Sequence, residues 1–242
     1  AEDTRNTIRL LQHFNIQTKL IAHHVHNESE SAQGILKLLM NHQDVALVSD
    51  AGYPLISDPG ATVVQTVLDA GFNVVPISGA SAVLDALIAS GLPAQPFLFY
   101  GFLPLQDKEC RQELNQLKAY PCTLVFYEAP HRIKKTLERM LPIMGDRKAV
   151  LAREITKLYE EFIRGTISEL IEVADDLKGE IVLVMEGNID DREKVVDLSE
   201  IHQRIQMYIE GGVSASQAIK QVAQEVGLSK NEVYASYHHK EH

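Results

Sequence analysis

The sequence of 242 residues lacks several features that would each place it in a particular class of protein. It has no apolar stretch of the roughly 18 to 20 residues that a membrane-spanning helix needs, and its charged first residues, AEDTRNTIRL, contain no signal-peptide core. It has only two cysteines, Cys110 and Cys122, which have no partners at metal-ligand spacing. We therefore expect a soluble cytoplasmic protein that has no disulfide framework and does not bind a membrane.

Positive charge is also scarce over the chain as a whole. The formal net charge is −10, whereas a protein that coats nucleic acid needs a cationic surface. One segment is an exception, because residues 131–157 contain eight Lys or Arg and only three acidic residues. This basic segment favours contact with one particular polyanion, although a solvated helix face could have the same composition.

Apolar runs that alternate with amphipathic stretches predict two successive α/β domains. In the first domain, VALVSD (45–50) and NVVPIS (73–78) are expected to be strands, and a helix is expected at 31–41. A second helix should lie between the two strands, with Asp58 as its cap and Gly71 at its end. A strand, a helix and a strand in succession predict a parallel sheet with a right-handed crossover.

A change in composition near residues 97–104 marks the predicted start of the second domain. Strands are predicted at 123–130, 148–154, 159–167 and 179–187, and helices at 108–120, 131–141 and 166–178. The predicted boundaries are therefore 1–98 for the first α/β domain, 99–190 for the second, and 191–242 for a charged linker and a small C-terminal helical domain.

The segment VSDAGYPLISDPG (48–60) gives the clearest functional signal. Glycine lets a backbone approach a ligand closely, and the start of the following helix offers free N–H groups. Ligands of open α/β sheets bind at loops of this kind, although the same residues could merely shape a tight turn. SGASA (78–82) repeats the pattern, and neither segment matches the glycine-rich fingerprints of NAD or ATP sites.

These two segments, together with YGFLP, FYEAPHR and AREITKLYEEFIRGT, resemble the ribosomal RNA small subunit methyltransferase I family of the tetrapyrrole-methylase superfamily. The resemblance extends from residue 1 to about residue 190. It implies an enzyme with two α/β domains and S-adenosylmethionine in the cleft between them, usually as a homodimer. The implied reaction is 2′-O-methylation of a cytidine ribose in small-subunit ribosomal RNA, with the assembled small subunit as the expected substrate. Family members begin with a strand and a P-x-G-N-L loop ahead of A-E-D-T-R, so we expect that first βα unit to be missing here.

The resemblance also implies site residues at the matching positions. The cofactor would be bound by Asp50, Ala51, Gly52, Pro54, Ser78, Gly79, Ala80, Ser81, Tyr127, Glu128, Ala129, Gly179 and Glu180. Catalytic or substrate-orienting groups would be Glu2, Asp3, Arg5, Arg153, Glu154, Lys157, Glu160 and Glu161. We place Lys157 first, because its amine could accept the ribose proton or bind a phosphate, although these charges could equally form surface salt bridges.

A group of histidines invites a metal hypothesis that we do not adopt. His23, His24 and His26 lack the spacing of a metal site, and methyl transfer needs no metal, so no metal is predicted. The H-N-E stretch (26–28) is instead expected to line the RNA side.

The C-terminal residues leave alternative functions open. Ala223, Gly227 and Val233 have the spacing of a helix-turn-helix, so one alternative is a DNA-binding regulator that uses the C-terminal helices. The other is a methylase of tetrapyrroles or other small molecules, which the basic segment 131–157 disfavours.

Overall fold

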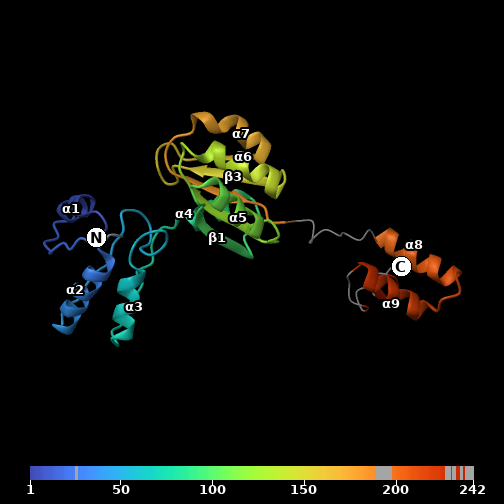
Figure 1. Ribbon diagram of the computed structural model, residues 1–242, viewed down its shortest axis with the longest axis horizontal. Helices are drawn as coiled ribbons and strands as arrows, with labels where there is room; N and C mark the ends of the chain where they lie inside the picture. Colours follow the sequence, from blue (N-terminus) through green and yellow to red (C-terminus); the bar gives the residue numbers. More distant parts are fainter. Residues whose placement is uncertain (25–26, 189–197, 227–229, 231–232, 235–236, 238–242) are drawn as a thin grey trace. The chain divides into compact units, whose positions relative to one another are not determined.

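The computed structural model describes residues 1–24, 27–188, 198–226, 230, 233–234 and 237 (Figure 1). The chain divides into two compact units, one of residues 1–118 and 122–186 and one of residues 119–121 and 187–242. The boundary expected between residues 98 and 99 lies inside the first unit, and the division into three domains stays a prediction.

One mixed sheet lies at the centre of the first unit. Its strand order is β1-β2-β5-β3-β4. The strands are β1 (Phe97–Phe102), β2 (Thr123–Glu128), β3 (Lys148–Arg153), β4 (Glu161–Thr166) and β5 (Ile181–Met185). Only the β1–β2 pair is parallel among these neighbours, since β5 is antiparallel to both β2 and β3, and β4 is antiparallel to β3. Four strands lie inside the ranges predicted for them, and β1 coincides with the apolar run at 97–104.

Alternation along the strands gives the sheet two apolar faces. Leu124 and Phe126 of β2 point to the face covered by three helices, whereas Val125 points to the opposite face. The three helices are α5 (Asp107–Leu117), α6 (Ile133–Met144) and α7 (Ile167–Val173), which continues into a short 3-10 turn, Ala174–Asp176. The opposite face packs against α4 (Ala82–Ser90) through Val83, Ala86 and Leu87.

Residues that precede α4 form three helices, α1 (Thr4–His13), α2 (Glu28–Met40) and α3 (Ala61–Asp69). Helices α2 and α3 lie side by side (Figure 1) and share a small core of Ala32, Ile35, Val63 and Val67. This pairing brings the start of α2 close to the start of α3, where the loop of residues 50–60 ends.

The two strands predicted in this region are wrong. Residues 45–50 and 73–78 are described, and neither segment pairs with a neighbour. Val75 and Ile77 are 74% and 82% exposed. Branched apolar residues favour strands, but a strand forms only where another segment supplies the ladder of hydrogen bonds. None of the described residues does so here, and the parallel sheet expected in this region is therefore also wrong.

The second unit contains α8 (Leu198–Glu210) and α9 (Ala215–Val226). They pack through Ile201 and Ile205 of α8, Ala218 and Val222 of α9, and Val233. Gly227, the turn residue of the predicted helix-turn-helix, lies outside the described residues, so that motif stays a prediction. Within the described ranges, no helix is both long enough and apolar enough to cross a lipid bilayer.

Candidate functional site

Tyr53 ties together the two loops that the sequence predicts for the cofactor. Its hydroxyl accepts a hydrogen bond from the Gly79 N–H at 2.6 Å and lies 3.1 Å from the Gly79 carbonyl oxygen, to which it can donate. A Cβ at Gly52 or at Gly79 would meet no atom of the described part of the chain within 4 Å. Both glycines therefore present bare backbone to open space, as a ligand held by peptide groups would require. Tyr53 was not among the predicted residues, although it is the one aromatic residue in VSDAGYPLISDPG.

The other loop residues predicted for the cofactor lie in the same two segments. Ser49 donates from its hydroxyl to the Gly52 carbonyl at 3.1 Å, and Gly52 has a φ of +73°, which favours glycine. Ser81 begins α4 by accepting a hydrogen bond from the Leu84 N–H. The predicted residues that fall in these tied loops are Asp50, Ala51, Gly52, Pro54, Ser78, Gly79, Ala80 and Ser81.

Asp50 also connects this loop to the opening A-E-D-T-R motif. Its carboxylate accepts hydrogen bonds from the Asn6 side chain at 2.8 Å and from the Asp3 N–H at 3.3 Å. Its own N–H donates to the Glu2 carboxylate at 3.3 Å. Asp3 caps α1, and hydrogen bonds from Arg5 lower the pKa of the Asp3 carboxyl to about 2. The structure thus brings Glu2 and Asp3 to the loop, whereas Arg5 is occupied by Asp3.

The prediction that Asp58 caps α3 is wrong, because the N-cap residue of this helix is Gly60. Burial, and then the nearby charge of Glu2, raises the pKa of the Asp58 carboxyl. Desolvation disfavours the ionised form, so this carboxyl holds its proton more readily than an exposed aspartate does.

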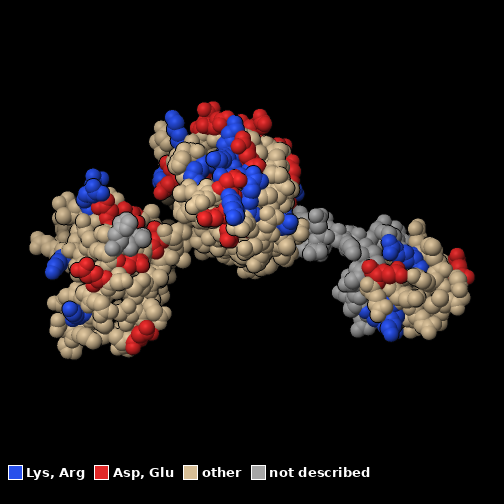
Figure 2. Space-filling model, in the orientation of Figure 1, with Lys and Arg blue, Asp and Glu red and all other residues tan. Residues whose placement is uncertain are grey.

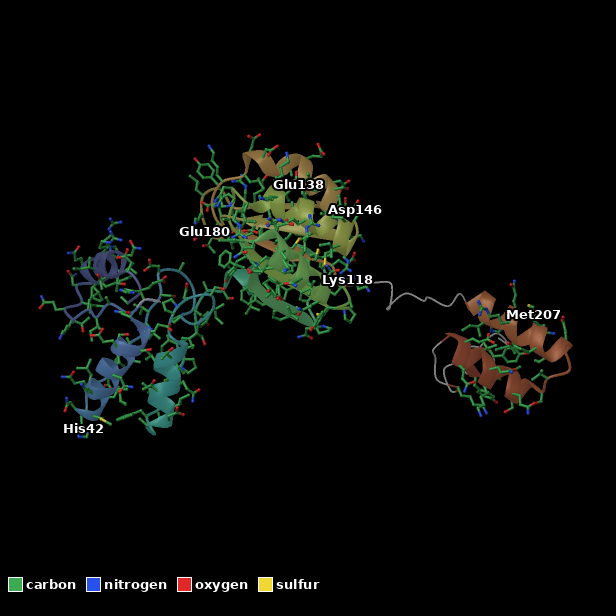
Figure 3. All side chains as sticks on the ribbon, in the orientation of Figure 1. His42, Lys118, Glu138, Asp146, Glu180 and Met207 are labelled. Atoms are coloured by element: carbon green, nitrogen blue, oxygen red, sulfur yellow. The ribbon has the colours of Figure 1, made fainter. Side chains whose placement is uncertain are left out.

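A second group of predicted residues meets beyond the end of β3. The Lys157 ammonium donates to Glu154 at 3.0 Å and to Glu180 at 2.6 Å, and the Glu180 N–H donates to Glu154 at 2.9 Å. Figure 3 labels Glu180, which lies just before β5. Gly179 has a φ of +88°, and a Cβ there would overlap the Glu154 carboxylate. We call Glu154, Lys157, Gly179 and Glu180 the charged cluster.

Backbone conformation and charge both mark the charged cluster as unusual. Glu154 and Thr156 have φ values of +50° and +67°, which non-glycine residues seldom adopt and which occur often at functional sites. Hydrogen bonds to Glu180 and Glu154 raise the pKa of the Lys157 ammonium. A lysine that keeps its proton is suited to binding an anion and not to acting as a base.

The other charged residues of AREITKLYEE pair within the same hairpin. Arg153 binds Glu161 across the β3–β4 pair at 2.6 Å. Glu160 accepts a hydrogen bond from the Thr156 N–H at 2.6 Å. These contacts stabilise the β3–β4 hairpin, which carries Glu154 and Lys157 of the charged cluster.

Tyr127 is one of the site residues predicted at the end of β2, and it is only partly buried. Its ring contacts Phe99 at a centroid distance of 4.9 Å and Phe102 at 5.5 Å. The Tyr127 ring is half-buried, and burial raises the pKa of its hydroxyl. This aromatic group could pack against a flat ring.

Glu128, by contrast, is bound inside the protein. It is 3% exposed and accepts hydrogen bonds from the Thr136 hydroxyl at 2.5 Å and the Ala129 N–H at 2.8 Å. The Arg132 guanidinium lies 3.3 Å from the same carboxylate. Both carboxylate oxygens therefore have partners within the chain, and a cofactor contact by the Glu128 side chain stays a prediction.

The basic segment 131–157 does not form a uniformly cationic face. Acidic and basic side chains are interleaved on this part of the molecule in the view of Figure 2. Lys134 pairs with Asp175, and Arg139 is only 7% exposed and pairs with Asp107 at 2.8 Å. The exposed cations of this segment include Lys135 and Lys148.

Comparison with known sequences places these observations in a family. The chain is similar to the tetrapyrrole (corrin/porphyrin) methylases, whose family profile matches residues 2–171. It is 47% identical to the ribosomal RNA small subunit methyltransferase I of Bacillus subtilis (strain 168), over 100% of this chain and 85% of the relative. The protein of the same name from Halalkalibacterium halodurans is 46% identical over 98% of this chain and 84% of its own length. The one from Escherichia coli O157:H7 is 41% identical, over 97% and 82% respectively.

Comparison with solved structures concerns the fold. The crystal structure of the methyltransferase CobJ superposes with a TM-score of 0.54, at 17% sequence identity, over 72% of this chain and 79% of that one. The likeness confirms the predicted mixed α/β fold class.

Proposed function

Because the chain belongs to the tetrapyrrole (corrin/porphyrin) methylase family, and within it to the ribosomal RNA small subunit methyltransferases I, we propose that it methylates the 2′-hydroxyl of a cytidine in small-subunit ribosomal RNA. The similarity to these relatives supports methyl transfer to ribosomal RNA. The choice of the ribose 2′-hydroxyl and of a cytidine goes further than that similarity and belongs to the proposal. The methyl donor is S-adenosylmethionine.

The observation that carries the proposal is the pair of loops held by Tyr53. Gly52 and Gly79 leave open space beside a backbone that is fixed at both loops, which fits a cofactor bound through peptide groups. S-adenosylmethionine would supply an electrophilic methyl group. The residues that would hold it are those of segments 50–54 and 78–81, and we propose that Tyr127 contributes from the end of β2.

The chain's own contribution to the reaction would be mainly the positioning of the RNA. Fixing two reactants in line can lower a barrier by several kcal/mol, with no need for a strong base. We propose that Lys157 binds a phosphate next to the target ribose. Glu180, which is 76% exposed, can yield its place to that phosphate, because an exposed ion pair contributes only about 0 to 1 kcal/mol.

A transfer assay tests the proposed function. Small subunits from cells that lack the activity, and the same RNA without proteins, are incubated with the chain and methyl-labelled S-adenosylmethionine. We expect label in the RNA of the subunits, at a cytidine whose following phosphodiester resists alkaline cleavage because its 2′-oxygen is blocked. Label on a base would refute the ribose assignment, and label only in added corrins or porphyrins would favour the small-molecule alternative.

The same family membership supports a homodimer, which stays a proposal. Sedimentation of the 242-residue chain tests it, and a mass of one chain at micromolar concentration would refute it. Duplex DNA binding without any methyl transfer would instead favour a regulator that uses the C-terminal helices.

A further inference from the structure

Helix α3 receives its N-terminal cap from another helix. Its N-cap residue, Gly60, has no side chain with which to bind the free N–H groups. Glu28, in the first turn of α2, takes this role. One of its carboxylate oxygens accepts a hydrogen bond from the Gly60 N–H at 2.8 Å, and the other accepts one from the Thr62 hydroxyl at 3.1 Å.

This contact fixes the point where the loop of residues 50–60 ends. A carboxylate is stabilised at the N-terminus of a helix by the partial positive charge there. Gly60 has a φ of +138°, and a Cβ at this position would lie 2.9 Å from the side chains of both Leu47 and Leu55. The Gly60 backbone is thus held by Glu28 through its N–H and is closely packed by two leucines.

Glu28 is itself backed by a buried histidine. His23 is 1% exposed, and its Nδ1 hydrogen-bonds the Ser31 hydroxyl. Its Nε2 lies 4.0 Å from the nearer Glu28 oxygen. His26, the first residue of H-N-E, lies outside the described residues, and the expected RNA-facing role of this stretch stays a prediction. The Glu28 carboxylate lies between the first residue of the α3 cap, Gly60, and the buried His23 ring.

We propose that Glu28 is a positioning residue for the loop of residues 50–60. By holding Gly60, it keeps the loop in the conformation in which the Tyr53 hydroxyl reaches Gly79. Its effect on catalysis rests on the proposed function of this loop in binding S-adenosylmethionine. Its effect on the loop itself does not depend on that function.

Amide hydrogen exchange measured by NMR on the 242-residue chain tests the positioning role directly. Two amides report on the two ends of the loop, because the Gly60 N–H donates to Glu28 and the Gly79 N–H donates to Tyr53. We expect Glu28→Ala to lose protection at both glycines. The Gly79 amide is the informative one, since it has no contact with Glu28 and a purely local cap would not affect it.

Cofactor affinity is the second readout. Calorimetry with S-adenosylmethionine should show a dissociation constant that is higher by about tenfold or more in Glu28→Ala, because the charged hydrogen bond that holds the loop is removed. In the transfer assay the KM for the cofactor should rise while kcat stays the same. Glu28→Gln keeps one acceptor oxygen, so its dissociation constant should lie between those of the wild-type chain and Glu28→Ala. The glutamine variant also provides the test if the alanine variant does not fold.

Glu30→Ala is the matched control. Glu30 lies in the same first turn of α2 and is exposed, so this variant should leave both amides and the cofactor affinity unchanged. Wild-type protection of Gly79 in Glu28→Ala would overturn the positioning role, and so would a loss of protection spread evenly over α2, α3 and the loop. A wild-type chain that binds no S-adenosylmethionine would refute the proposed function, while the exchange data would still decide the positioning role.

Discussion

Replacing Gly179 with alanine should disrupt the charged cluster. The residue has a φ of +88°, and a Cβ there would overlap the Glu154 carboxylate. A left-handed conformation costs a non-glycine residue about 1 to 2 kcal/mol. Forcing a packed neighbour aside costs about 1 to 3 kcal/mol more. We therefore expect the free energy of unfolding to fall by about 2 to 5 kcal/mol, which lowers the melting temperature by at least about 4 °C.

Gly91→Ala separates the two parts of this cost. Gly91 ends α4 in the left-handed conformation, with a φ of +82° and a ψ of 4°, but a Cβ there would meet no atom of the described residues within 4 Å. Only the backbone cost of about 1 to 2 kcal/mol should then appear. Urea unfolding followed by far-UV circular dichroism at pH 7 measures both variants. Methyl transfer should fall in Gly179→Ala, because Glu154 can no longer hold Lys157, and should be retained in Gly91→Ala.

Removing the overlapping side chain provides a second check. When Glu154→Ala is combined with Gly179→Ala, the double variant should be more stable than the sum of the two single losses predicts. Equal losses for Gly91→Ala and Gly179→Ala, or strict additivity in the double variant, would show that Glu154 does not occupy the space that Gly179 leaves.

Three further predictions concern charge. Lys157→Ala should lower kcat at saturating cofactor, whereas Lys157→Arg should restore phosphate binding. Restored turnover in Lys157→Arg would contradict a role of Lys157 as the base. Full turnover in both variants would contradict any role of Lys157 in the reaction. Reversing the exposed Lys135 and Lys148 to glutamate should weaken RNA binding and reduce the slope of log affinity against log salt by about 0.7 to 0.9 for each RNA phosphate that is no longer neutralised, without affecting cofactor affinity. An unchanged slope would show that neither lysine touches the RNA. Asp58→Asn should stabilise the fold at pH 7, because the raised pKa of the Asp58 carboxyl shows that its ionisation is unfavourable in the folded state. This gain in stability should vanish at pH values below the pKa that the Asp58 carboxyl has in the unfolded chain. Urea unfolding at pH 7 and pH 3 measures this gain, and an equal gain at both values would refute the assignment to ionisation.

The sheet was predictable because its signal is local. Along β2, Leu124, Val125 and Phe126 are all buried, with turn residues before and after the strand, and the pattern needs no knowledge of the neighbours. The segments around Val75 and Ile77 have the same composition, yet they form no strand. The composition of a segment indicates which secondary structure it favours. A β-ladder also needs a second segment to pair with, and the sequence of the first segment does not reveal whether one is present.

The candidate site shows the same limit at the level of single residues. Sequence motifs singled out the segments that contain Asp50 and Gly79, but they did not reveal that Tyr53 joins these two segments. Glu28 is separated from Gly60 by 32 positions, and their contact depends on how α2 packs on α3. The cap was assigned to Asp58 because it is adjacent to the helix in sequence, whereas the structure supplies it through tertiary packing.

The position of β5 in the sheet has a consequence for synthesis of the chain on the ribosome. This strand is the last of the five to be made, and yet it lies between β2 and β3. Until residues 181–185 leave the exit tunnel, β2 and β3 each have an open edge that another nascent chain could join. The earlier strands can form only separate pairs, β1 with β2 and β3 with β4. The sheet must therefore close in a late step. A chain that stalls before residues 181–185 have left the exit tunnel should aggregate more readily than one that stalls after they have left it.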